Sequence, residues 1–122
     1  MSEQPAVVDD ADEAYEIIKS IARRTVTGSI PAPVIYALVG NLKSAGGYTL
    51  AEVLRNMANG LQASLKTHDV YDNGGDAAAN ADQAAAELKA AAKLAEQIGQ
   101  HLDAAQTAIN QQGYRPRETS GD

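Results

Sequence analysis

The chain has 122 residues, a net charge of −6 at pH 7 and no cysteine. The length is that of one domain, and the absent cysteines exclude disulfides and thiolate metal sites. The acidic balance argues against nucleic-acid binding, because phosphate contacts need clustered Lys and Arg. The N-terminal sequence lacks an apolar signal segment and no apolar run is long enough to cross a bilayer, so we expect a cytoplasmic protein without a membrane segment.

Apolar residues make up 44% of the chain, but most of them are small. Phe and Trp are absent, all five aromatic residues are Tyr, and alanine supplies much of the apolar content. Alanine forms helix well but buries little area. The composition therefore predicts helices with a thin core, which favours burial against a partner surface.

The first eight residues, 1–8, are expected to form a flexible lead, followed by a helix over residues 10–27. Asp10 and Glu13 have the spacing of a capping box, and Gly28 is a stop signal. Carboxylates crowd the first turns, where they complement the helix dipole. They form an acidic face that consists of Asp9, Asp10, Asp12, Glu13 and Glu16.

Two further helices are predicted at residues 31–44 and 49–67. Residues 34–42 are apolar nearly all round, as in a buried helix, and Gly40 among them favours a close helix crossing. The sequence SAGGY at 44–48 is typical of a turn, and Thr49 with Glu52 forms a second capping box. Residues 68–76 are rich in turn-forming residues and predict a loop.

The last helix is predicted at residues 77–112, between an Asp76 cap and a Gly113 stop, and residues 114–122 are predicted to be a disordered tail. Small and apolar residues recur along this helix at alternating spacings of three and four, which is the coiled-coil period. This interaction seam consists of Ala84, Leu88, Ala91, Ala95, Ile98, Leu102, Ala105 and Ile109.

The length and the flanks of the last helix bear on its partners. Its flanking positions are mostly small or apolar, which suits a bundle with more than one neighbour. At ~1.5 Å per residue the helix is about 54 Å long, whereas each other predicted helix is at most about half that. Three arrangements follow: self-association, a kink near Gly99 that folds the helix back, or a closed monomer with a frayed N-terminal turn. The seam and the length favour self-association.

Candidate chemistry is sparse. His68, Asp69 and Asp72 could offer ligands to a divalent metal, but two carboxylates and one imidazole suit a solvated loop better. No nucleophile, dinucleotide or phosphate-binding motif is present. We therefore predict no catalytic residue, no cofactor, no small-molecule ligand and no enzymatic activity.

Two alternatives to self-association come from other surfaces. Residues 31–67 have the outline of a helix-turn-helix DNA reader, although Arg55 is the single positive charge near the start of the second helix, where base contacts would be made. The second alternative is an inhibitor or antitoxin whose acidic face binds a basic partner.

The segments YTLAEVLRNMANGL and AAQTAINQQGYRPR, with the alanine-rich sequence between them, resemble small helical proteins from phages and conjugative elements of high-GC actinobacteria. The resemblance covers mainly residues 48–115. It implies an accessory protein that binds rather than catalyses.

The sequence thus predicts an all-α bundle of three short helices and one long, alanine-rich C-terminal helix with coiled-coil-like heptads. We expect one helical domain over residues 9–113. Its predicted function is protein–protein interaction, with a second copy of itself or with another protein.

Overall fold

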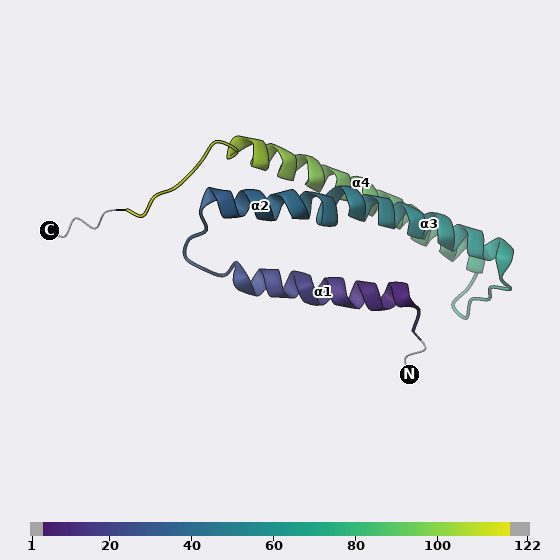
Figure 1. Cartoon of the computed structure of the whole chain (residues 1–122). Helices are drawn as coiled ribbons and strands as arrows, with labels where there is room; N and C mark the ends of the chain where they lie inside the picture. The colour runs from purple at the N-terminus through teal and green to yellow at the C-terminus, as the bar shows by residue number, and fades with distance from the viewer. Residues whose placement is uncertain (1–3, 118–122) are drawn as a thin grey trace. The chain divides into compact units, whose positions relative to one another are not determined.

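The computed structural model describes residues 4–117, and within that range the chain is all-α, without a strand (Figure 1). Its elements are α1 (Ala6–Arg24), α2 (Ala32–Lys43), the π-helical turn η1 (Ser44–Tyr48), α3 (Thr49–Thr67) and α4 (Ala77–Ala108). The chain divides into two compact units, Met1–Pro31 and Ala32–Asp122, where the sequence led us to expect one domain. Residues 1–3 of the predicted lead and 118–122 of the predicted tail lie outside the described residues.

The first helix, α1, begins before its predicted start. Pro5 occupies the N-cap position without a side-chain hydrogen bond. Asp10 therefore lies inside the helix, and the capping box predicted for it and Glu13 does not form. Asp9 falls in the first turn instead, where its charge still complements the helix dipole.

The C-terminal end of α1 is also earlier than predicted. The helix ends at Arg24, and the hydroxyl of Thr25 donates a hydrogen bond to the carbonyl of Ile21 (2.8 Å). This bond satisfies one of the carbonyls left open at a helix end, so Gly28 is not the stop. No residue of α1 is buried.

In the second unit, α2, η1 and α3 follow one another without a break, and α4 runs antiparallel beside them (Figure 1). The prediction of a turn at residues 44–48 is therefore wrong, because residues 32–67 form one continuous helical rod. Thr49 lies inside this rod, so its predicted capping box with Glu52 does not form. The angle between two helices that a helix-turn-helix needs is likewise not present in residues 32–67.

The π-helical turn keeps the apolar side of the rod in register. Twelve positions separate the buried Val39 from the buried Ala51, one more than the roughly eleven residues of three α-helical turns. A π-helical turn accommodates one such extra residue. Val39, Ala51 and Ala58 can therefore all be buried along one rod.

The long helix α4 is unbroken, so the alternative of a kink near Gly99 is wrong. Asp76 caps it as predicted, since its carboxylate accepts a hydrogen bond from the N–H of Ala79 (3.1 Å). The rod of residues 32–67 is as long as α4 and contacts it through α2, η1 and α3. The chain therefore covers one side of α4 by itself, and helix length alone no longer argues for a partner.

Small residues fill the contact between the rod and α4, and no large side chain is fully buried in the described part of the chain. The five buried residues of α4 and several half-buried ones recur at spacings of four and three. We call this row, which Ile109 continues just after the helix, the inner stripe; it consists of Ala81, Ala85, Leu88, Ala92, Ala95, Gly99, Leu102, Gln106 and Ile109.

The backbones of the rod and α4 come very close at two glycines. A Cβ atom on Gly47 would lie 2.7 Å from the Cα of Gly99 and 2.9 Å from its nitrogen, and a Cβ on Gly99 would lie 2.8 Å from the Tyr48 ring. At Gly40, where the sequence favoured a close crossing, an added Cβ would meet only the end of the Gln106 side chain, at 2.9 Å. Close approach therefore requires glycine at position 47 above all, because the colliding atoms there are backbone.

Gly47→Ala is expected to lower the free energy of unfolding by about 1–3 kcal/mol, the usual effect of forcing an extra methyl group into a packed contact. Guanidinium denaturation followed by circular dichroism measures it. Gly60→Ala is the matched control, because Gly60 lies in α3 with open space around its Cα, and alanine there should stabilise by about 0.5–1 kcal/mol. Equal stabilisation by both substitutions would contradict the close approach.

Candidate interaction surface

The structure places the predicted seam residues on two stripes of α4. Four belong to the inner stripe: Ala95, which is buried, and Leu88, Leu102 and Ile109, which are half-buried. The other four each precede an inner-stripe residue by one position: Ala84 and Ala91, which are half-buried, and Ile98 and Ala105, which are exposed. The predicted seam therefore combines residues that pack within the chain with residues that remain accessible.

Large apolar side chains remain exposed beside the inner contact on both helices. On α3, Leu50 and Met57 precede the buried Ala51 and Ala58 by one position and are 36% and 50% exposed. On α4, Ile98 precedes Gly99 and is 49% exposed. In two antiparallel helices, the residues that stand one position before an inner-contact residue lie on the same side of the pair. We call this side the bare face, which consists of Leu50, Val53, Met57, Ala84, Ala91, Leu94 and Ile98.

The opposite side of the helix pair is polar. Arg55 of α3 forms an ion pair with Glu96 of α4. The side-chain amide of Gln62 donates a hydrogen bond to Asp82 (3.3 Å). From the first contact to the second, the residue number rises from 55 to 62 on the rod and falls from 96 to 82 on α4, as expected for an antiparallel pair. These contacts join the rod to α4 on one side only and leave the bare face without polar links.

A cluster of polar groups fastens α2 and η1 to the C-terminal half of α4. Lys43 Nζ donates to Asp103 (2.8 Å) and to the side-chain oxygen of Gln106 (2.7 Å). The hydroxyl of Tyr48 donates to the second Asp103 oxygen (3.3 Å), and the Gln106 amide donates to the carbonyl of Tyr36 (3.1 Å). The hydrogen bond from Lys43 lowers the pKa of Asp103, and the same bond raises the pKa of Lys43.

Asp103→Asn is expected to destabilise the protein in a pH-dependent way. Because its folded-state pKa is lowered, ionised Asp103 stabilises the fold above the ordinary carboxyl value of 3.8, and this stabilisation is lost as the pH falls through the lowered pKa. The stability gap between the parent chain and the variant should therefore be wider at pH 7 than at pH 2 in thermal denaturation. A gap of the same size at both pH values would contradict the role given to the Lys43 bond.

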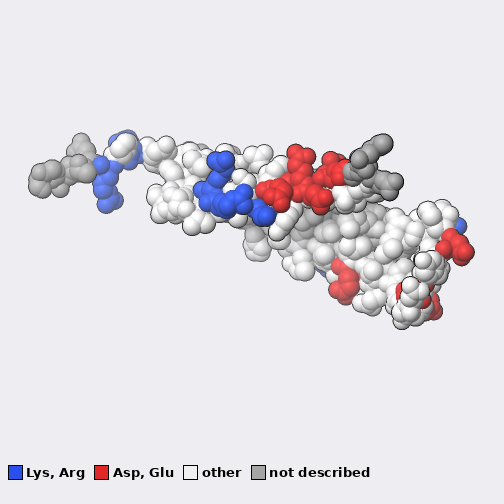
Figure 2. All heavy atoms as spheres, turned by 90° about the horizontal axis from the view of Figure 1, so that it is seen from below, with Lys and Arg blue, Asp and Glu red and all other residues white. Residues whose placement is uncertain are grey.

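The predicted acidic face lies exposed along the N-terminal part of α1. Figure 2 shows the acidic side chains gathered there and basic ones following toward the C-terminal end of the helix. The side chain of Gln4 donates to Asp9 (2.6 Å) and Asp12 (3.0 Å), and Lys19 pairs with Glu16 (3.6 Å). Local contacts thus offset part of this charge, and a basic partner for the face stays a prediction.

The structure does not bring together the three loop residues considered as metal ligands, His68, Asp69 and Asp72, as a metal site would require. Asp72 accepts hydrogen bonds from the side chain of Asn80 (2.7 Å) and from the N–H of Gly74 (2.7 Å). These bonds, the Asn80 bond most of all, lower the pKa of Asp72. Within residues 4–117, no three His, Asp or Glu side chains are grouped so as to hold a metal ion. Asp72 fastens the loop to the start of α4.

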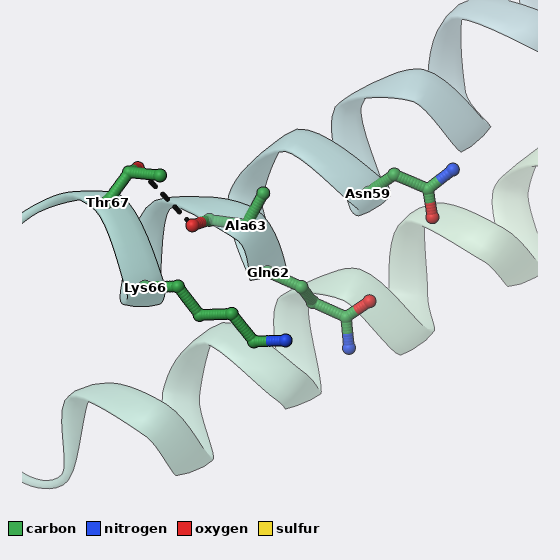
Figure 3. Close-up of a pocket in the computed structure, with 5 residues that line it drawn as sticks. All are labelled: Asn59, Gln62, Ala63, Lys66 and Thr67. Atoms are coloured by element: carbon green, nitrogen blue, oxygen red, sulfur yellow. Dashed lines mark hydrogen bonds between the residues drawn. The ribbon is translucent and has the colours of Figure 1, made fainter.

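A hollow of about 360 Å³ lies beside α3 and is lined by Asn59, Gln62, Ala63, Lys66 and Thr67 (Figure 3). The hydroxyl of Thr67 donates to the carbonyl of Ala63 (3.3 Å). All five residues come from one helix, so no side chains from a second element converge on the hollow. Ligand sites are usually built by convergence of that kind, and the bare face is the stronger candidate surface.

Four residues of the bare face, Leu50, Val53 and Met57 of α3 and Leu94 of α4, were not among the predicted interaction residues. The signal for the three on α3 was present in the sequence of residues 49–67. Val53 and Leu54 are adjacent apolar residues, and a single helix stripe with spacing of three and four cannot hold both. An apolar stripe of that width indicates two contacts, one with α4 and one on the adjoining side.

Known proteins give no guide to the use of this surface. No known family, no curated protein and no solved structure matches the chain. Between residues 4 and 117, none of the helices is long and apolar enough to cross a lipid bilayer.

Proposed function

We propose that this protein is a non-enzymatic assembly module that associates with itself through the bare face. The observation that carries the proposal is the row of large apolar side chains left exposed on one side of α3 and α4. Met57, Leu94 and Ile98 are 50%, 60% and 49% exposed. Isolated exposed apolar residues are common, but contiguous apolar patches typically mark sites of interaction.

The energy available from covering this face supports the same proposal. Full burial of a Leu, Ile or Met side chain contributes about 1.5–3 kcal/mol. The core within the chain consists of small residues, which gain little from burial. Association would therefore bury the larger side chains that the monomer leaves accessible, and α4 would contact two neighbours, as the wide stripe of small flanking residues suggests.

The resemblance of residues 48–115 to small helical proteins of phages and conjugative elements supports a binding role. We propose an accessory protein that works in the cytoplasm as part of an assembly. The alternative of a DNA-binding regulator has less support, because residues 32–67 are a continuous rod and Arg55, in its second half, is already paired with Glu96. An inhibitor that uses the acidic face of α1 stays a hypothesis.

Sedimentation velocity at micromolar concentration tests the proposal. The parent chain is expected to sediment at a multiple of its 12.7 kDa mass, and Ile98→Glu should return it to the monomer, because a charge cannot be buried without a partner. Ala95 is unsuitable for this test, since it is buried within the chain and a charge there would unfold the monomer.

Gln100→Glu is the matched control, because it adds the same charge to an exposed position on the other side of α4. It should leave the assembly intact, and circular dichroism should show both variants helical. A 12.7 kDa monomer across the concentration range for the parent chain would contradict the proposed self-association.

A further inference from the structure

The exposed side of α4 carries a second heptad pattern beside the inner stripe. Its members alternate at spacings of three and four, and none is buried. We call them the outer stripe, which consists of Ala84, Glu87, Ala91, Leu94, Ile98, His101, Ala105 and Ala108. At ~1.5 Å per residue this stripe is about 36 Å long, and a coiled-coil period on an open side fits another helix of similar length.

We propose that the helix covering this stripe is α4 of a second copy, packed antiparallel about a two-fold axis near residue 96. This inference rests on the self-association proposed above and adds the orientation and register of the pair. In that arrangement Leu94 lies level with the partner's Ile98, and Ile98 with the partner's Leu94. The largest apolar residues of the stripe then meet at the centre, and the small residues lie toward both ends.

Charge complementarity selects the antiparallel orientation. With the axis near residue 96, Glu87 lies within about one helical turn of His101 of the partner subunit, and the symmetric contact repeats at the other end. An imidazole N–H can donate to a carboxylate in either protonation state of the ring. Gln83 already donates to Glu87 (3.4 Å), and a carboxylate accepts more than one hydrogen bond. A parallel pair would instead set Glu87 against Glu87 of the partner subunit, which is a repulsive contact.

The charges around the stripe agree with a second copy as the occupant. By helix geometry, the basic residues of α2 to α4 all lie away from the bare face: Lys43, Arg55, Lys66, Lys89 and Lys93. A nucleic acid or an acidic peptide would therefore find no Lys or Arg of α2 to α4 on this side, whereas an identical apolar face matches it. Leu50, Val53 and Met57 of α3 flank α4 and would extend the contact to a four-helix assembly.

Cysteine cross-linking tests the orientation, because the parent chain has no cysteine. In the proposed pair, two copies of Ala84→Cys hold their thiols about 36 Å apart along the helix axis, and so do two copies of Ala108→Cys. Neither variant alone should form a disulfide-linked dimer under mild oxidation. An equimolar mixture of the two should form one, because position 84 lies level with position 108 of the partner subunit. Gln100→Cys, on the polar side, is the control that should not link.

The outcomes separate this inference from the proposed function. Covalent dimers from each single variant alone, with none specific to the mixture, would overturn the antiparallel register and leave self-association standing. A monomer in sedimentation with no cross-link in any sample would overturn both.

A charge swap gives a second, independent readout. Glu87→Lys should raise the dimer Kd about tenfold, since it replaces the carboxylate that accepts from the His101 ring of the partner subunit with a second donor, and adding His101→Glu should restore the parent Kd. Circular dichroism should show both variants helical. Failure of the second substitution to restore binding would contradict the contact between these two positions.

Discussion

The close approach of the rod to α4 is the constraint on which the rest of the structure depends. At Gly47 and Gly99 the two backbones nearly touch, and an added Cβ would lie 2.7 Å from the facing Cα. Only small residues can line a contact of this kind, which is why the buried positions of α4 are alanine and glycine. The π-helical turn serves the same contact, because it brings Gly47 onto the line of Val39 and Ala51.

A contact built from small residues leaves the large ones elsewhere. On the polar side of the pair, ion pairs add to this thin contact: Arg55 pairs with Glu96, and Lys43 of α2 pairs with Asp103. On the bare face no such ion pair joins the described residues of the two helices, and Ile98 stays exposed together with the apolar residues near it. The two sides of one helix pair therefore have different roles: polar contacts set the antiparallel pairing within the chain, and apolar side chains are available to a second chain.

Local signals in the sequence were enough to predict much of the fold. The all-α class, the loop at 68–76 and the Asp76 cap follow from composition, turn residues and one carboxylate before an alanine run. The continuity of the rod could not be predicted in this way, because SAGGY has the composition of a turn and only its packing against α4 makes it helical. The capping boxes at Asp10 and Thr49 failed for a similar reason, since neighbouring residues extended each helix past the local signal.

The sequence predicted only part of the candidate surface. A heptad spacing is the same for the inner and outer stripes, so Ala95 and Ile98 entered one seam although they lie on different stripes. The comparison of the last helix with each shorter helix also led to a wrong expectation, because α2, η1 and α3 form one rod that covers α4 from within the chain. The sequence could not tell which residues of α4 are buried against the rod and which are exposed beside it. That distinction depends on the register of α3 against α4.

The most direct test of the account is an isotope-filtered nuclear Overhauser measurement on a mixture of labelled and unlabelled chains, which detects only contacts between copies. We expect signals between the methyl groups of Leu94 in one copy and Ile98 in the other. A concentrated sample in which these methyl groups show contacts only within their own chain would contradict it.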